Sequence, residues 1–177
     1  MNKTGVDPDP KILKKNILVL TSDDFFDINR YKYDVIFVDG MHQSEYVLRD
    51  VNNSINVLTN NCCNKYLFLD DILPLNYNEQ LKVPIQHYYE KGILKYGENW
   101  TGDVWKIVYH LLKCYRNKIA NFAYYYNINF RGIGVFQFTE PFEIKADEIV
   151  AINEYNYFTD FSMYVQLLNA VSAETIC

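Results

Sequence analysis

The chain has 177 residues, of which 49% are hydrophobic, and a formal net charge of −5. This length and apolar content are enough for one domain with a buried core, so we expect residues 1–177 to form a single domain. The negative charge argues against a nucleic-acid-binding surface, and a small lysine cluster is typical of a solvated face (Lys11, Lys14, Lys15). No apolar run approaches the ~18 residues of a membrane helix, and the polar N-terminus is not a signal peptide. We therefore expect a soluble, cytoplasmic protein without a membrane or nucleic-acid partner.

The four cysteines do not have the spacing of a zinc site or a disulfide framework. Cys62 and Cys63 are adjacent, and Cys114 and Cys177 stand alone. Since paired CxxC spacing is absent, we predict reduced thiols.

The N-terminal part contains two short strand candidates. Residues 1–6 are typical of the end of a strand whose last carboxylate is Asp7, and two prolines stop any continuation. Residues 15–21 form the second candidate. Ser22 and Asp23 follow it as an N-cap-like pair before a short segment, residues 24–29.

The central part predicts a strand–helix–strand unit. Residues 33–38 are mostly β-branched or aromatic and end abruptly at Asp39-Gly40, a pattern typical of a buried parallel strand. Residues 44–60 have a helical period, and the next strand, residues 65–69, ends at Asp70-Asp71. A right-handed crossover makes the two strands parallel, so the three carboxylates meet at one sheet edge, together with His42. That edge is where open α/β sheets bind ligands.

This cluster has two interpretations. Asp39, Asp70 and Asp71 are hard oxygen ligands that suit octahedral Mg²⁺ or Mn²⁺, and a cation would relieve their mutual repulsion. His42 could then take a proton from a hydroxyl that the metal acidifies. In the alternative, Asp39 and Asp71 only cap the helix or turn that follows each, and His42 is a solvated turn residue.

The remaining elements are predicted from their apolar patterns. Residues 72–100 are a long irregular stretch rich in aromatics, which we interpret as a lid. A helix is expected after Thr101-Gly102-Asp103, with Asp103 available as its cap. Residues 122–128 and 132–138 predict an antiparallel hairpin with Gly132 free to take positive φ, and residues 155–171 a closing helix that buries Phe158.

Five segments together resemble class I S-adenosylmethionine-dependent methyltransferases, in particular the metal-dependent O-methyltransferases of macrolide sugars and catechols. The segments are Gly5-Val6-Asp7-Pro8, Thr21-Ser22-Asp23-Asp24-Phe25-Phe26, Asp34-Val35-Ile36-Phe37-Val38-Asp39-Gly40-Met41-His42, Leu69-Asp70-Asp71 and Gly102-Asp103-Val104-Trp105-Lys106. The resemblance implies an α/β fold with a Rossmann-like, mostly parallel sheet and a C-terminal antiparallel hairpin. It also implies methyl transfer to a hydroxyl of a small molecule, plausibly a sugar.

The resemblance also implies roles for individual residues. Asp7 matches the acidic residue that holds the cofactor ribose, and Ser22 and Asp23 match the region near the adenine. Asp39, Asp70 and Asp71 match the metal ligands, while His42 matches the general base of the sugar enzymes. The implied cofactors are S-adenosylmethionine and Mg²⁺ or Mn²⁺.

One family feature has no counterpart in the chain. The family's first strand and its Gly-rich turn, which hold the methionine end of the cofactor, precede the segment that contains Asp7, and the chain begins just before Gly5. We therefore expect an N-terminally truncated methyltransferase-like domain, with a gap or a direct pairing of the strands ending at Asp7 and Asp39. Two hypotheses stay open: a methyltransferase, or a catalytically inactive or fragmentary relative that serves as a homo-oligomeric interaction scaffold.

Overall fold

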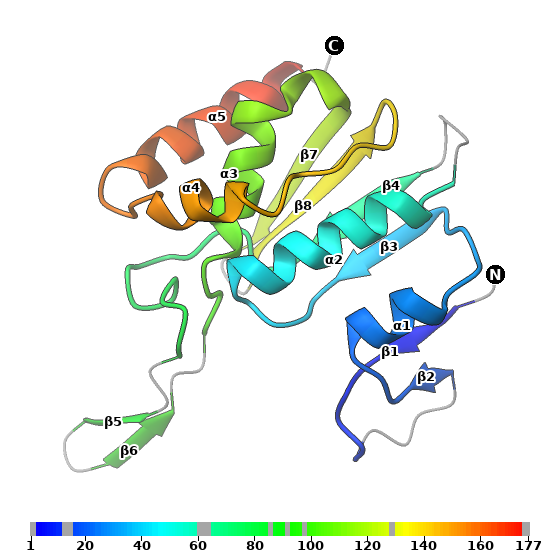
Figure 1. Cartoon of the computed structure of the whole chain (residues 1–177). Helices are drawn as coiled ribbons and strands as arrows, with labels where there is room; N and C mark the ends of the chain where they lie inside the picture. The colour runs from blue at the N-terminus through cyan, green and yellow to red at the C-terminus, as the bar shows by residue number, and fades with distance from the viewer. Residues whose placement is uncertain are drawn as a thin grey trace. The chain divides into compact units, whose positions relative to one another are not determined.

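The structure is a computed structural model that describes residues 3–11, 16–59, 65–84, 87–90, 93–96, 99–127 and 130–174. The chain divides into two compact units, Met1–Lys32 and Tyr33–Cys177 (Figure 1). The described part contains no helix that is both long and apolar enough to cross a membrane.

The first unit contains two short strands and one helix. β1 (Gly5–Val6) and β2 (Ile17–Leu18) pair in parallel, which confirms the two predicted strand positions. α1 (Ser22–Ile28) follows, and its N-cap is Thr21, whose hydroxyl accepts the Asp24 N–H at 3.1 Å. The expected cap at Ser22-Asp23 is therefore shifted by one residue, because threonine also supplies the oxygen that a cap needs.

The second unit is built on a four-stranded mixed sheet. β3 (Val35–Val38) and β4 (Tyr66–Leu69) are parallel, and β7 (Ile119–Asn127) and β8 (Phe130–Phe138) extend the sheet in the order β3-β4-β8-β7 with antiparallel pairs. The unit is thus α/β, and the predicted parallel βαβ unit and antiparallel hairpin are both present. A mostly parallel sheet is not confirmed, since one of the three pairs in this sheet is parallel.

Helices cover one face of this sheet, and the hydrophobic core lies between the helices and the sheet. They are α2 (Ser44–Val57), α3 (Val104–Cys114), α4 (Glu148–Glu154) and α5 (Asp160–Glu174), with a 3₁₀ turn at Arg116–Lys118. Alternate strand residues such as Leu67, Leu69 and Phe136 are fully buried beneath them. On the opposite face of the sheet, the β3 side chains of Val35 and Phe37 remain 55% and 51% exposed. Side chains alternate between the two faces because a strand has a two-residue period.

The C-terminal prediction needs a correction. The expected helix at 155–171 begins only at Asp160, because residues 155–159 form a turn in which the Asp160 carboxylate accepts the Asn156 N–H. Phe158 lies in that turn and is 72% exposed rather than buried. The preceding helix, α4, was not predicted, since a two-turn segment carries too little periodicity to be recognised.

Two other local predictions also differ from the structure. β5 (His87–Glu90) and β6 (Ile93–Tyr96) form a hairpin inside the stretch that was expected to be irregular. Phe130 and Arg131, expected in the turn of the later hairpin, belong to β8, and Phe130 pairs with Asn127. Gly132 has a φ of +85°, as its glycine freedom allows, but inside the strand.

Candidate functional site

The carboxyl ends of β3 and β4 lie side by side. The parallel register pairs Val38 with Leu69, so Asp39 and Asp70 are the next residues on the two strands. Asp39, His42 and Asp71 each offer one ligand atom, and these atoms all lie within 4.8 Å of one another. The predicted convergence of acidic groups and one imidazole at this edge is therefore present in the described structure.

His42 lies between the two carboxylates. Its Nε2 is 3.4 Å from Asp39 Oδ1, and its Nδ1 is 3.3 Å from Asp71 Oδ2. The same Nδ1 is 2.9 Å from the main-chain carbonyl oxygen of Trp100, and the indole lies against the imidazole with a centroid distance of 5.1 Å. The imidazole is mostly buried, with 17% of the side chain exposed. It is thus held by contacts on two sides and is not a solvated turn residue.

Asp70 and Asp71 play different parts. Asp71 has a φ of +56°, an uncommon conformation for a residue other than glycine. Asp70 Oδ1 accepts the Asp71 N–H at 2.9 Å, so this carboxylate supports the turn. Asp70 is not among the three residues whose ligand atoms converge. The structure thus separates one of the three expected ligands from the other two.

The pKa values of the groups at this edge are shifted in different directions. Burial raises the pKa of Asp71 to about 6, and the neighbouring Asp70 and Asp39 charges add to the increase. The hydrogen bond with His42 lowers the pKa of Asp39. Burial opposes protonation of His42, but its hydrogen bonds to Asp39 and Trp100 and the nearby carboxylates outweigh it and raise its pKa. The cluster therefore attracts positive charge.

The side-chain contacts do not match the alternative in which Asp39 and Asp71 only cap the helix or turn that follows each. Gln43 is the N-cap of α2 and makes no side-chain cap bond. Asp103, at the N-cap position of α3, does not cap its own helix either. Its carboxylate instead accepts the backbone N–H of Ser44, at the start of α2, at 2.6 Å. Asp39 and Asp71 are left facing His42.

The segment 100–103 packs directly on the turn that carries His42. Asp103 N–H donates to the His42 carbonyl at 3.1 Å. Gly102 has a φ of +56°, and a Cβ there would lie 1.6 Å from the same carbonyl oxygen. No other residue type can therefore occupy position 102 without moving this segment.

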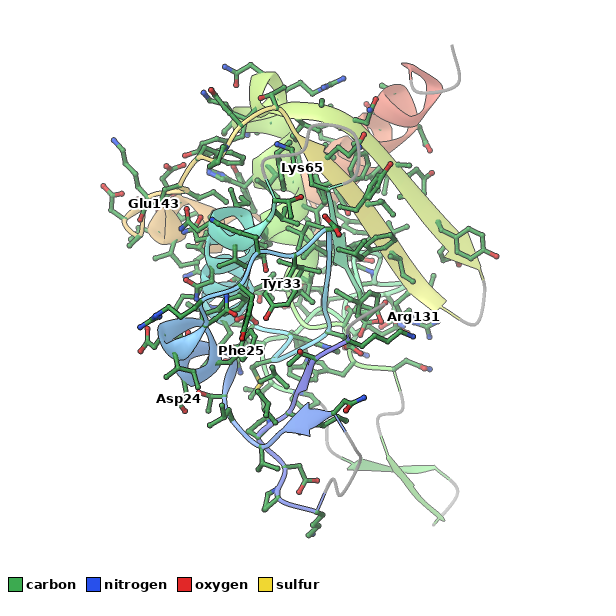
Figure 2. The ribbon with its side chains drawn as sticks, turned by 90° about the vertical axis from the view of Figure 1, so that its right-hand side faces the viewer. Asp24, Phe25, Tyr33, Lys65, Arg131 and Glu143 are labelled. Atoms are coloured by element: carbon green, nitrogen blue, oxygen red, sulfur yellow. The ribbon has the colours of Figure 1, made fainter. Side chains whose placement is uncertain are left out.

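An ion pair between Arg131 and Glu79 anchors segment 100–103. Arg131 makes two bonds to the Glu79 carboxylate, Nε to Oε2 at 2.8 Å and a second nitrogen to Oε1 at 3.1 Å. The Glu79 carbonyl accepts the N–H groups of Thr101 and Gly102, both at 3.0 Å. Arg131 and Lys65 lie at opposite ends of the sheet (Figure 2), so this ion pair is at the same end as Asp71.

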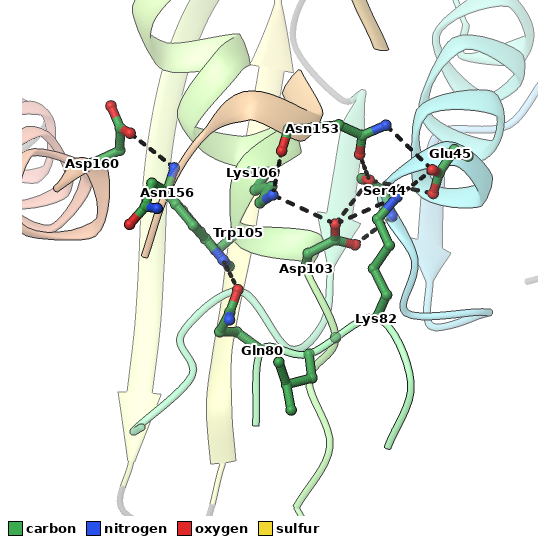
Figure 3. A network of polar contacts seen from close by, with 12 residues as sticks. Ser44, Glu45, Gln80, Lys82, Asp103, Trp105, Lys106, Asn153, Asn156 and Asp160 are labelled. Carbon is green, nitrogen blue, oxygen red and sulfur yellow. Dashed lines mark hydrogen bonds and ion pairs between the residues drawn. The ribbon is translucent and has the colours of Figure 1, made fainter. Parts of the chain in front are cut away.

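A polar network with buried members at Ser44, Asp103 and Lys106 continues across three helices (Figure 3). Ser44 Oγ lies 3.0 Å from both Asp103 Oδ2 and Asn153 Oδ1, and Lys106 Nζ donates to the Asn153 carbonyl at 2.9 Å. Lys82 pairs with Glu45 and lies 4.0 Å from Asp103. Burial raises the pKa of Asp103 and lowers that of Lys106. The network joins α2, α3 and α4 next to the cluster.

The residues expected to hold the cofactor belong to the first unit. Asp7 ends β1, and its N–H donates to the Leu18 carbonyl at 3.0 Å, so Asp7 lies level with the end of β2. Its Oδ1 accepts the Asp9 N–H at 2.8 Å. Ser22 and Asp23 lie in the first turn of α1, which begins at Ser22, while β2 ends at Leu18. All three thus follow the carboxyl ends of one parallel strand pair.

Sequence reasoning missed the supporting residues Trp100, Glu79 and Arg131. They lie in loops or at a strand start, where no periodic pattern marks them. The Gly102-Asp103 pair was a signal, but for a helix start rather than for contact with His42. His110 is a buried histidine with both ring nitrogens in hydrogen bonds, to Glu148 at 2.6 Å and to Tyr155 at 3.0 Å. The side chain of His87 lies outside the described residues.

No protein-family model, curated protein or solved structure matches the chain.

Proposed function

We propose that the chain is a divalent-metal-assisted O-methyltransferase that acts on a hydroxyl of a small molecule such as a sugar. The observation that carries this proposal is the convergence of Asp39, His42 and Asp71 at the carboxyl ends of two parallel strands. Ligand sites of α/β sheets lie at such an edge, and the cluster holds both hard oxygen ligands and a basic nitrogen.

The residues present fit a divalent cation. Burial raises the pKa of Asp71, and the neighbouring charges of Asp70 and Asp39 add to the increase, so a cation bound at this edge would relieve an unfavourable charge. Carboxylate oxygens suit Mg²⁺ or Mn²⁺, which complete their octahedral shell with water and substrate oxygens. Asp39 and Asp71 would hold the ion, and Asp70 supports Asp71 through its backbone bond.

His42 and Trp100 would then have separate roles in the reaction. A bound Mg²⁺ or Mn²⁺ supplies acidification of the acceptor hydroxyl. His42 takes the hydroxyl proton on Nε2, the ring nitrogen on the Asp39 side. Trp100 packs on the imidazole and keeps it in place. The burial of the imidazole limits its contact with water, which favours a fixed geometry for proton transfer.

The assignment of S-adenosylmethionine as methyl donor rests on the resemblance of Asp7, Ser22 and Asp23 to the cofactor-contacting residues of that family. Their place after the ends of two parallel strands supports it, because hydroxyl-rich cofactors bind at such strand ends. The finer fold proposal is a Rossmann-like methyltransferase sheet.

The test is calorimetric titration of S-adenosylmethionine into the 177-residue chain, with and without Mg²⁺, followed by methyl transfer to sugar and phenol acceptors. Micromolar cofactor binding and Mg²⁺-dependent methylation are expected. A folded chain that binds no cofactor would contradict the methyltransferase assignment. Asp39→Asn and Asp71→Asn should abolish the Mg²⁺-dependent methylation. Asp147→Asn is their matched control, because Asp147 is an exposed carboxylate at an N-cap position without a side-chain cap bond.

A second candidate function is a homo-oligomeric scaffold. The specific observation is that β3 ends the four-stranded sheet and carries Val35 and Phe37 half exposed. An edge strand with apolar side chains is a template for pairing with another chain. Sedimentation equilibrium distinguishes the candidates: a scaffold should dimerise and lose the dimer in Phe37→Glu, but not in Val150→Glu on the exposed side of α4.

A further inference from the structure

We infer that the main-chain carbonyl of Trp100 fixes the tautomer of His42, so that Nδ1 carries the proton and Nε2 presents the free lone pair. This inference rests on the proposed function, in which His42 is the base, and names the ring nitrogen that takes the proton. It also makes segment 100–103 a positioning element for His42.

The oxygen atoms around the imidazole carry the argument. Nδ1 faces two acceptors, the Trp100 carbonyl at 2.9 Å and Asp71 Oδ2 at 3.3 Å. Nε2 faces one acceptor, Asp39 Oδ1, at 3.4 Å. A neutral imidazole has one N–H donor and one bare nitrogen. A bare Nδ1 would face two oxygens, the nearer at 2.9 Å, whereas a bare Nε2 faces one oxygen at 3.4 Å, so the hydrogen belongs on Nδ1.

The Trp100 carbonyl differs from the carboxylates because it does not titrate, so it can accept the Nδ1 hydrogen at any pH at which the chain is folded. A backbone carbonyl that accepts one ring N–H sets which nitrogen is left for chemistry, as is common for functional histidines. Nε2 then lies next to Asp39, at the cation side of the ring.

Three contacts keep the carbonyl in place. Asp103 N–H donates to the His42 carbonyl at 3.1 Å, which ties the segment to the turn that carries the imidazole. Trp100 Nε1 donates to the Leu81 carbonyl at 2.6 Å. Gly102 allows the close approach, since any Cβ would collide with the His42 carbonyl. The carbonyl and the imidazole are therefore positioned by the same short segment.

The test is ¹⁵N NMR of the histidine side chains in the metal-free, chelator-treated full chain. The chain has three histidines, and a His42→Asn variant assigns the His42 signals. At a pH of about 9, well above the ordinary histidine pKa of ~6.5, a single tautomer with a protonated Nδ1 and a bare Nε2 is expected. A protonated Nε2, or an even mixture of the two tautomers, would overturn the inference.

A pair of glycine variants tests the positioning role. Gly102→Ala moves the segment, so the tautomer preference should fall to a mixture in the folded variant. Gly5→Ala is the control for a glycine replacement in the first unit, because a Cβ there would meet the Ile17 side chain of β2, and its tautomer should match the wild type. An unchanged tautomer in folded Gly102→Ala would refute the role of the segment. If neither variant folds, the wild-type spectrum decides.

The tautomer result is independent of the proposed reaction, since the protein is measured without metal, cofactor or acceptor. A chain that binds no metal but shows the Nδ1–H tautomer would contradict the proposed function and uphold this inference. A chain that binds metal but shows the opposite tautomer would uphold the metal site and contradict this inference.

Discussion

Asp103 Oδ1 accepts the backbone N–H of Ser44 at 2.6 Å, so a carboxylate at the start of α3 caps a different helix, α2. The Ser44 hydroxyl lies 3.0 Å from the second oxygen of the same carboxylate. Through this pair the two helices begin at one point, next to His42. The contact therefore links the packing of the helices to the geometry of the site.

Two serines of α2 provide a matched test of that link. Ser44 and Ser54 are both fully buried, but Ser54 Oγ makes no hydrogen bond within the described structure. Ser44→Ala should lower the free energy of unfolding by about 1–3 kcal/mol, since a bond to a charged group is lost. Ser54→Ala should leave it unchanged or raise it by up to ~1 kcal/mol, because an unpaired buried hydroxyl is removed. Urea unfolding of both variants measures the difference; equal losses would contradict the assigned bonds.

The two-pronged bond between Arg131 and Glu79 predicts that lysine is a poor replacement. Arg131→Lys keeps the charge but loses the planar fork that meets both oxygens, so stability should fall by about 1–2 kcal/mol. Lys118→Arg, in the exposed pair with Glu140, is the control and should change little. Thermal unfolding monitors both, and full stability of Arg131→Lys would show that the fork is not required.

The raised pKa of Asp71 predicts an unusual pH dependence of the stability of the metal-free protein. Its pKa is raised from the usual 3.8 to about 6, so the folded state holds a proton more tightly than the unfolded state. That contribution to stability is complete below the ordinary pKa and is lost as the pH rises through about 6. Asp71→Asn should remove this loss and make the metal-free chain more stable than wild type above pH 6.

Asn also tolerates the positive φ at position 71, so the substitution changes the charge while it keeps the backbone. Urea midpoints on either side of the pH range from 4 to 6 check the prediction. If the urea midpoint of the variant changes with pH in the same way as that of the wild type across that range, Asp71 titrates normally.

The elements with a clear period could be predicted from the sequence. The parallel pair around α2 was predicted because a strand pattern, a helical period and a second strand pattern follow one another, and this unit alone brings Asp39 and Asp71 to one edge. The antiparallel hairpin was visible for the same reason.

The missed features depend on contacts between distant segments. Nothing local indicates that Trp100 would contact His42, 58 residues earlier, or that Asp103 would cap α2 instead of its own helix. Likewise, Asp70 and Asp71 are equivalent ligands by spacing. The positive φ of Asp71 turns one carboxylate toward His42 and leaves the other bonded to the backbone.

The most direct test of the metal site is calorimetric titration of Mn²⁺ or Mg²⁺ into the chelator-treated chain, compared with Asp39→Asn, Asp71→Asn and the control Asp147→Asn. One saturable site is expected in the wild type and in Asp147→Asn, with affinity reduced at least about tenfold in each ligand variant. Equal binding by the wild type and Asp71→Asn, or no saturable binding by the folded wild type, would contradict the account.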